Sequence, residues 1–232
     1  MPRPNKSVAT PRPPAVKLRH APQQVRIIGG AWKRTPLPVT VIDGLRPTPD
    51  RVRETLFNWL GQTLDGLRCL DLFAGTGALG FEAASRGAAR VVLVERHPRA
   101  AKQLHAIKDK LGAVTVEIAE ADAIRFATNL PPSSFDVVFL DPPFDSALLG
   151  DALKLAMPLV APGGVLYVEA AVPIDRVVGM TKKATETTKG ASGAMNEATQ
   201  EAADELPPGW SVDRQGKAGL VHYHLLRREI DE

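Results

Sequence analysis

The chain has 232 residues, of which 44% are hydrophobic and 24% are charged, so it can bury a core of ordinary size. Its single cysteine, Cys69, excludes a disulfide framework and a cysteine zinc cluster, and is typical of a reducing cytosol. No hydrophobic run is long enough to span a bilayer, and the N-terminus lacks the apolar stretch of a secretory signal. We therefore expect a cytoplasmic protein with no membrane contact.

The charge is distributed unevenly along the chain. Residues 1–53 hold eleven lysines and arginines against two acids, whereas the rest of the chain is net acidic. A basic segment joined to an acidic domain indicates a polyanionic partner such as RNA or DNA, although a solvated tail that aids solubility explains the charge equally well. Residues 1–24 include six prolines and few large apolar side chains, so we expect this part to be a disordered tail.

Residues 25–62 are expected to form a small N-terminal unit. Apolar runs at 25–28 and 37–41 surround a pair of glycines and predict a β-hairpin. A helix should follow, because Thr48 is a suitable N-cap and Pro49 is suited to the first helical position. The apolar face of this helix is expected to comprise Val52, Leu56, Trp59 and Leu60.

Residues 63–232 are expected to form the main domain, in which apolar strands alternate with helices. The predicted strands are 67–72, 90–95, 114–118, 135–140 and 165–169. The predicted helices are 78–86, 98–111, 123–128 and 147–159, the last of them stopped by the sequence APGG at 161–164. Repeated units of this kind predict an α/β fold with a doubly wound parallel sheet.

The end of the chain departs from this alternation. Residues 180–205 contain no large apolar side chain except two methionines, and we expect a low-complexity insertion there. Two further strands, at 210–214 and 220–226, should add an antiparallel edge to the sheet. The five histidines show no spacing that would bind a metal ion, so no metal site is expected.

The first motif, DLFAGTGALG at 71–80, lies where the first strand of the expected sheet turns into a helix. Gly75 and Gly77 belong to a G-x-G-x-x-G pattern, which also occurs in dinucleotide-binding loops. Asp71 ends the strand with a carboxylate, which would oppose a pyrophosphate but could bind an ammonium group. Together with Phe73, this favours S-adenosylmethionine, a cofactor with a cationic amine and a cationic sulfonium.

Two more acids follow the next two predicted strands. Glu95 could accept hydrogen bonds from both ribose hydroxyls of an adenosine. Asp122, followed by Ala123, could accept a hydrogen bond from the adenine amino group, or it could be the N-cap of the next helix. We therefore expect both positions to contribute to a cofactor site.

The sequence DPPF at 141–144 is the most specific signal in the chain. Pro142 and Pro143 can continue neither a helix nor a central strand, so they predict a rigid loop at the edge of the sheet that carries the glycine loop. Asp141 and the carbonyl of Pro142 could accept hydrogen bonds from an exocyclic amine and stabilise the charge that develops on it. Phe144 could stack on the face of an extruded base.

These motifs together resemble a known family. The stretches RIIGGAWK (26–33), GLRPTPDRVRETLFNWL (44–60), CLDLFAGTGALGFEAASRGA (69–88), VVLVERH (91–97) and DVVFLDPPF (136–144) are similar to the RsmD-type RNA (guanine-N2)-methyltransferases of bacteria. The resemblance covers residues 25–170 and resumes at 207–229. It implies a class I S-adenosylmethionine-dependent methyltransferase with a Rossmann-like sheet and an N-terminal β-hairpin module.

The resemblance also implies a substrate and roles for individual residues. It implies methylation of one guanine N2 in small-subunit (16S) ribosomal RNA, on an assembling 30S particle, by an enzyme that we expect to be a monomer. The matching cofactor positions are Asp71, Phe73, Gly75, Gly77, Glu95 and Asp122, to which we add Ala123. The matching catalytic loop is Asp141, Pro142, Pro143 and Phe144. His97 departs from the family, because an acid or amide is more usual there.

A group of basic residues is expected to bind RNA phosphates beside the catalytic loop. Its members are Arg26, Lys33, Arg34, Arg46 and Arg51. Related enzymes use the same catalytic loop on another RNA, on DNA adenine or on a protein glutamine. The basic N-terminal segment favours nucleic acid over protein, and the family resemblance alone favours guanine over adenine.

Overall fold

The protein is described by a computed structural model that covers residues 24–39, 48–143, 146–178 and 206–230. The tail at 1–23 and the insertion at 180–205 lie outside the described residues, so the expectations for these segments stay predictions. Within the described ranges, no helix is both long enough and apolar enough to cross a bilayer.

Two sheets are present in the described part of the chain. The small one pairs β1 (Gln24–Arg26) with β2 (Pro36–Pro38) and forms the expected antiparallel hairpin. The large one has seven strands in the order β5-β4-β3-β6-β7-β9-β8. Its strands are β3 (Arg68–Asp71), β4 (Arg90–Glu95), β5 (Val116–Glu120), β6 (Phe135–Leu140), β7 (Val160–Ala170), β8 (Trp210–Ala218) and β9 (Val221–Arg228).

The first five strands of the large sheet run parallel, and β9 and β8 complete it as an antiparallel edge. The chain builds outward from β3 through β4 to β5, and then returns to place β6 on the other side of β3. The reversal puts a topological switch point between β3 and β6, where ligands bind at the carboxyl ends of the strands. The predicted doubly wound sheet with its antiparallel edge is confirmed.

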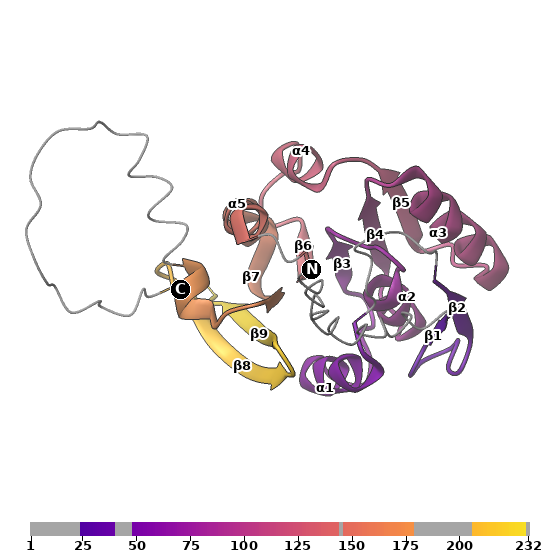
Figure 1. Ribbon diagram of the computed structural model, residues 1–232, viewed down its shortest axis with the longest axis horizontal. Helices are drawn as coiled ribbons and strands as arrows, with labels where there is room; N and C mark the ends of the chain where they lie inside the picture. Colours follow the sequence, from indigo (N-terminus) through magenta and orange to yellow (C-terminus); the bar gives the residue numbers. More distant parts are fainter. Residues whose placement is uncertain (1–23, 40–47, 144–145, 179–205, 231–232) are drawn as a thin grey trace, which may run out of the picture.

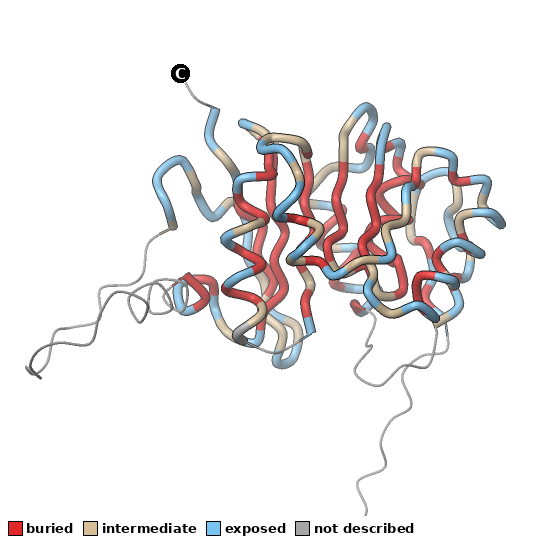
Figure 2. Tube along the Cα trace, turned by 90° about the horizontal axis from the view of Figure 1, so that it is seen from above, coloured by how far each residue is buried: buried red, intermediate tan, exposed pale blue. Residues whose placement is uncertain are grey.

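Helices cover both faces of the sheet (Figure 1). On one face, α1 (Asp50–Leu60), α2 (Ala78–Ser85) and α3 (Pro98–Leu111) form one hydrophobic core together with the hairpin. On the other face, α4 (Ala123–Thr128) and α5 (Ser146–Leu159) pack over a second core. Figure 2 shows the strands as buried segments lying side by side, with helices that are exposed on their outer sides.

The predicted helices and strands are present in the structure, but several differ in their bounds. The third predicted strand, 114–118, is displaced: β5 is Val116–Glu120, and Val114 is 89% exposed. The APGG sequence does not separate α5 from the next strand, because it lies within β7. The pairing of β6 with β7 shifts register between Phe135 and Val137, and Gly163 has a φ of 76° there, so an irregular extended segment replaces the expected turn.

Helix α1 begins and packs differently from the prediction. Its N-cap position is Pro49, and Thr48 makes no capping hydrogen bond. Val52 and Leu56 are buried as expected, but Arg53 and Phe57 complete the buried side, while Trp59 and Leu60 are only half-buried. The apolar spacing therefore located the helix correctly, but the buried face is rotated from the predicted one toward Arg53 and Phe57.

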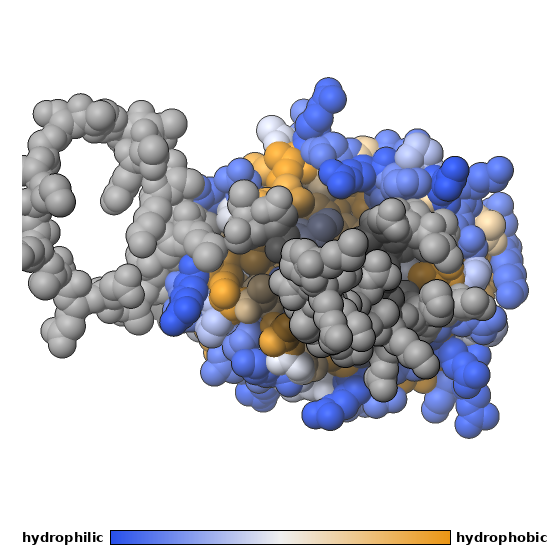
Figure 3. Space-filling view, viewed as in Figure 1, coloured by the Kyte–Doolittle hydropathy of each residue, from blue (hydrophilic) through white to orange (hydrophobic). Residues whose placement is uncertain are grey.

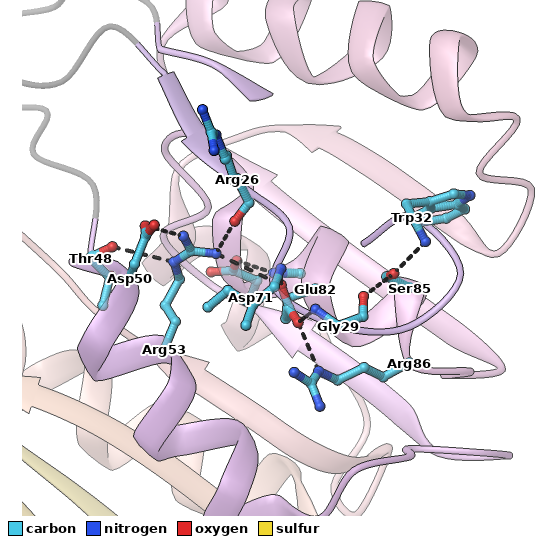
Figure 4. Close-up of polar contacts among 12 residues, drawn as sticks. Arg26, Gly29, Trp32, Thr48, Asp50, Arg53, Asp71, Glu82, Ser85 and Arg86 are labelled. Carbon is cyan, nitrogen blue, oxygen red and sulfur yellow. Dashed lines mark hydrogen bonds and ion pairs between the residues drawn. The ribbon is translucent and has the colours of Figure 1, made fainter. Parts of the chain in front are cut away.

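A buried network of charges attaches the hairpin and α1 to α2 (Figure 4). Glu82 of α2 accepts hydrogen bonds from the backbone N–H groups of Ile28 and Gly29, both 2.7 Å long. Arg86 pairs with Oε1 of Glu82 at 2.8 Å, and Arg53 reaches the carbonyl oxygen of Arg26 at 2.9 Å. Because α2 starts at the glycine loop, this network fixes the N-terminal unit relative to the carboxyl edge of the sheet.

Candidate active site

The glycine loop follows β3 at the switch point. Asp71 is the last residue of β3, and its side chain is buried. Gly75 and Gly77 have φ values of 51° and 75°, a left-handed conformation that side chains other than hydrogen disfavour. Oδ2 of Asp71 accepts the backbone N–H of Gly80 at 3.2 Å, so the strand end is tied to the first turn of α2.

The environment of Asp71 suits a cationic ligand. Burial, and second to it repulsion by Asp141, raise the pKa of its carboxyl to about 7 against the opposing effect of the N–H of Gly80. Among the described residues, no lysine or arginine forms an ion pair with Asp71. Asp71 is thus a buried carboxyl that precedes the glycine loop and pairs with no described cation. Such a carboxyl can bind the amine of S-adenosylmethionine, so the residues present fit this cofactor.

Glu95 holds the glycine loop from the neighbouring strand. It is half-buried at the end of β4; its Oε2 accepts the N–H of Gly75 at 2.9 Å, and its Oε1 accepts the N–H of His97 at 2.7 Å. His97 is the N-cap of α3 and accepts the N–H of Arg99 at 3.2 Å. Each oxygen of Glu95 retains a second lone pair, so the side chain can still accept from ribose hydroxyls.

Asp122 lies exposed after β5 and caps α4, because its Oδ1 accepts the N–H of Arg125 at 3.0 Å. The capping alternative is therefore confirmed. The adenine contact stays a prediction, as does the role of the buried Ala123 beside it. Phe73 is half-buried in the loop and packs against the core on the α4 and α5 face.

The DPPF loop begins directly after β6. Asp141 is half-buried, Pro142 is buried and Pro143 is exposed, while Phe144 lies outside the described residues. Oγ1 of Thr48 donates a hydrogen bond to Oδ2 of Asp141 at 3.1 Å. The residue expected to cap α1 thus contacts the DPPF loop instead. Burial raises the pKa of Asp141 to about 6, and the Thr48 hydroxyl acts against this rise.

Sequence reasoning missed one acid at this edge. Glu169 lies near the end of β7 and is only 4% exposed. Its Oε1 accepts the hydroxyl of Tyr167 at 2.8 Å. Burial raises the pKa of Glu169 to about 8, with repulsion by Asp141 as the second cause. The available signal was the acid that ends the apolar run VLYVE, at the same relative position as Glu95 in VVLVE.

The structure brings the predicted acids to one edge of the sheet. Asp71, Glu95, Asp122 and Asp141 each lie at or just after the carboxyl end of a different parallel strand. Figure 3, in the view of Figure 1, shows hydrophilic residues around the margin of the visible face and hydrophobic residues nearer its middle.

A separate groove, lined by residues such as Met157, Pro207 and Trp210, involves none of these acids.

The basic residues are placed in two regions. Lys33 and Arg34 lie exposed on the hairpin turn, whose neighbours Ala31 and Trp32 donate hydrogen bonds to Ser85 at the C-terminal end of α2. Arg51 is exposed on the first turn of α1, close in sequence to Thr48, whose hydroxyl contacts Asp141 of the DPPF loop. Arg26 is exposed at the end of β1, and Arg46 lies outside the described residues.

Comparison with known proteins identifies relatives over most of the chain. The protein-family model described as conserved hypothetical protein 95 matches residues 25–199. Ribosomal RNA small subunit methyltransferase D of Escherichia coli is 36% identical over 206 residues, covering 89% of this chain and 91% of the relative. The Haemophilus influenzae protein of the same name is 42% identical over 161 residues, covering 66% and 82% of the two chains.

Solved structures agree with these sequence matches. The yhhF protein of Escherichia coli superposes with a TM-score of 0.69 and 33% identity, over 90% of this chain and 99% of that one. TrmN from Thermus thermophilus, at 21% identity and a TM-score of 0.55 over 77% and 48% of the two chains, shares the fold alone. The sheet order and these neighbours confirm the class I methyltransferase fold.

Proposed function

This chain belongs to the conserved hypothetical protein 95 family, and on that premise we propose that it is an S-adenosylmethionine-dependent methyltransferase of small-subunit ribosomal RNA. We further propose that its target is the N2 amine of one guanine in 16S RNA, presented on an assembling 30S particle. One observation carries the proposal: Asp71 ends β3, and Asp141 directly follows the neighbouring strand β6 at the switch point of the sheet. This arrangement supports the proposal of a cation site beside an amine site.

Residues on the β3 and β4 side are proposed to hold the cofactor. The Asp71 carboxylate would bind the amine, and Glu95 would accept from the ribose hydroxyls while it holds the loop at Gly75. The cofactor supplies a methyl group activated on a sulfonium. Further contacts are proposed for Phe73, Gly77, Asp122 and Ala123.

Residues after β6 are proposed to hold the target amine. The lone pair of an aromatic amine is delocalised into its ring, so the amine is a weak nucleophile. Acceptors at Asp141 and the carbonyl of Pro142 would orient the nitrogen and stabilise its developing positive charge. With the cofactor bound, the amine would form the new nitrogen–carbon bond as the carbon–sulfur bond breaks with its electrons on sulfur, and it would then lose one proton. Pro143 stiffens the loop, and Phe144 is proposed to stack on the base.

The substrate proposal also rests on charge. Arg26, Lys33, Arg34, Arg46 and Arg51 are proposed to contact RNA phosphates, which position a substrate without specifying its sequence. A monomer in the bacterial cytoplasm, where ribosomal subunits assemble, is the working form that we propose. The alternative is an enzyme with the same chemistry that acts on another RNA or on DNA adenine.

The direct test locates the transferred methyl group. The full chain is incubated with tritiated S-adenosylmethionine and 30S particles from a strain deficient in methylation, and the labelled nucleoside is identified after digestion. We expect label in N2-methylguanosine of 16S RNA, and loss of about a hundredfold or more in rate for Asp141→Ala with retained binding of S-adenosylhomocysteine. Label in adenine, or in another RNA offered in parallel, would support the alternative instead.

A further inference from the structure

Three carboxyl groups lie at the ends of adjacent strands of the large sheet. They belong to Asp71 on β3, Asp141 after β6 and Glu169 on β7. The function proposed above uses the first two and leaves Glu169 without a role. A buried acid next to the DPPF loop lowers the stability of the fold unless its charge is removed or balanced. The presence of Glu169 there therefore needs a physical explanation.

Glu169 is the immediate neighbour of Asp141 across the sheet. Leu140 of β6 pairs with Val168 of β7, so the residues that follow them lie side by side. Oε1 of Glu169 accepts the hydroxyl of Tyr167 at 2.8 Å, and Tyr167 is completely buried. The Tyr167 hydroxyl therefore holds the Glu169 carboxyl in one orientation. Asp141, at the start of the DPPF loop, is its neighbour on the adjacent strand.

One hydroxyl serves both carboxyls. Oγ1 of Thr48 donates to Oδ2 of Asp141 at 3.1 Å, and the same hydroxyl stabilises the ionised form of Glu169. A threonine hydroxyl has a single hydrogen, so it can donate to only one of the two at a time. Two ionised carboxylates would also repel each other strongly in this buried position. The pair is therefore satisfied when it holds one additional proton.

Among the described residues, no positive charge forms an ion pair with either carboxyl to replace that proton. Asp141 comes from β6, Tyr167 from β7, and β9 places Tyr223 opposite Glu169. His224 pairs with Val168, and its side chain lies on the other face of the sheet.

The first turn of α1, next to Thr48, carries Asp50 and Arg53, which pair with each other at 2.6 Å. Within the described ranges, neither Asp141 nor Glu169 forms an ion pair with a basic residue.

We propose that Glu169 is a positioning residue of the methyl transfer: it carries the proton of the pair, so that Asp141 stays ionised and the Thr48 hydroxyl orients Asp141 toward the amine. This inference rests on the proposed function. The order of ionisation supports it, because burial raises the pKa of Asp141 to about 6 and that of Glu169 to about 8. When the amine gives its proton to Asp141, the pair holds two protons, and one then passes to water.

The test is the pH profile of single-turnover methyl transfer to 30S particles at saturating cofactor. In the wild type, the rate should rise as Asp141 ionises and fall at alkaline pH as Glu169 ionises and takes the Thr48 hydrogen bond. Glu169→Gln cannot ionise, so its alkaline fall should vanish, and at pH 9 it should exceed the wild type by about tenfold. Asp151→Asn, an exposed substitution on α5, serves as the matched control and should keep the wild-type profile.

Tyr167→Phe provides a second, independent variant. It removes the hydroxyl that stabilises ionised Glu169, so the alkaline fall should move to higher pH while the acidic rise stays in place. A residue that only supports the fold would shift neither limb in this selective way. An alkaline fall that persists in Glu169→Gln, or that does not move in Tyr167→Phe, would overturn the proposal.

A measurement without activity separates this inference from the proposed function. Infrared difference spectra of the free protein should show a neutral carboxyl band at pH 7 that Glu169→Gln lacks, and whose disappearance shifts to higher pH in Tyr167→Phe. Absence of that band would overturn the shared proton even in an active enzyme. If the band is present but the wild type methylates no RNA, the proposed function fails and the protonated pair stands.

Discussion

Nη1 of Arg53 lies 3.8 Å from Oε2 of Glu82, and both side chains are completely shielded from solvent. The pair joins α1 to α2, and the same Glu82 carboxylate holds the backbone of the hairpin at Ile28 and Gly29. Arg86 provides a second cation on the other oxygen, with its guanidinium carbon 4.8 Å from the ring centroid of Phe57. One carboxylate thus connects three parts of the chain in the interior.

Glu82→Gln should strongly destabilise the protein. The substitution keeps the shape of the side chain but removes the counter-charge of the buried Arg86 and leaves Arg53 paired with the exposed Asp50 alone. Breaking a buried ion pair costs about 3–5 kcal/mol in comparable cases. Urea unfolding followed by circular dichroism measures the change. The half-exposed pair of Arg90 and Glu117 is the control, because Glu117→Gln should change the unfolding free energy by about 1 kcal/mol or less. Equal effects of the two substitutions would contradict a structural role for the buried network.

Arg53 also shows where sequence reasoning on the fold failed. Apolar periodicity located every βα unit of the sheet, because strands buried on both faces read as continuous hydrophobic runs. The same reasoning counted Arg53 among the charges available to a polyanion. Its burial depends on Glu82, Asp50 and the Arg26 carbonyl converging from separate segments, and no local pattern encodes that convergence.

Glu95→Ala should weaken binding of S-adenosylhomocysteine while the protein stays folded. Two hydrogen bonds to the ribose would be lost, at a cost of about 1–3 kcal/mol, and the N–H of Gly75 would lose the acceptor that shapes the loop. Isothermal titration calorimetry measures the affinity. Glu95→Gln keeps an acceptor oxygen and should lose less. An unchanged affinity in a folded Glu95→Ala protein would remove Glu95 from the cofactor site.

Binding of the cationic cofactor should strengthen as pH rises from 6 to 8. The pKa of Asp71 is about 7 in the free protein, so below that value binding must first remove a proton. The affinity of S-adenosylmethionine should fall by up to about tenfold per pH unit below this pKa, and Asp71→Asn should bind weakly with little pH dependence. Calorimetry at several pH values checks both expectations, with Asp151→Asn as the exposed control.

The same raised pKa sets the sign of its effect on stability. Asp71 holds its proton more tightly in the folded protein than in the unfolded chain. Its contribution to the free energy of unfolding is therefore fully present below about pH 4 and is lost as pH rises through about 7. The free protein should therefore lose stability across this range, and Asp71→Asn should flatten the loss. A slope that is identical in the variant would show that Asp71 is already ionised when the protein is free.

The site was predicted best where a residue type and its place at a strand end carry the chemistry. Asp71 and Glu95 end their strands and Asp141 directly follows one, and parallel strands bring their carboxyl ends to one edge. Thr48 was assigned to a helix cap because its contact with Asp141 joins segments far apart in sequence. Glu169 escaped notice because an acid at the end of an apolar run is also common on a solvated surface, and only the pairing of β6 with β7 sets it beside Asp141.

The basic residues should differ in their contribution to RNA binding. Each phosphate contact that is removed should flatten the dependence of log affinity on log salt by roughly 0.7 to 0.9. Arg51 lies close in sequence to Thr48, which contacts the DPPF loop, whereas Lys33 and Arg34 lie on the hairpin turn against the C-terminal end of α2. Affinity for 30S particles is measured across salt concentrations for Arg51→Ala and for the double variant Lys33→Ala, Arg34→Ala.

Phosphate contacts position an RNA without reading its sequence, so both variants should methylate the same nucleotide as the parent protein. If the double variant keeps the parental slope while Arg51→Ala flattens it, RNA contacts are confined to the side of α1. If neither slope changes, the basic charge serves solubility and the phosphate proposal is wrong. Deletion of residues 1–24 tests the tail separately: it should lower affinity and leave the methylated nucleotide unchanged, because a proline-rich basic segment adds charge but no fixed surface that could read a base.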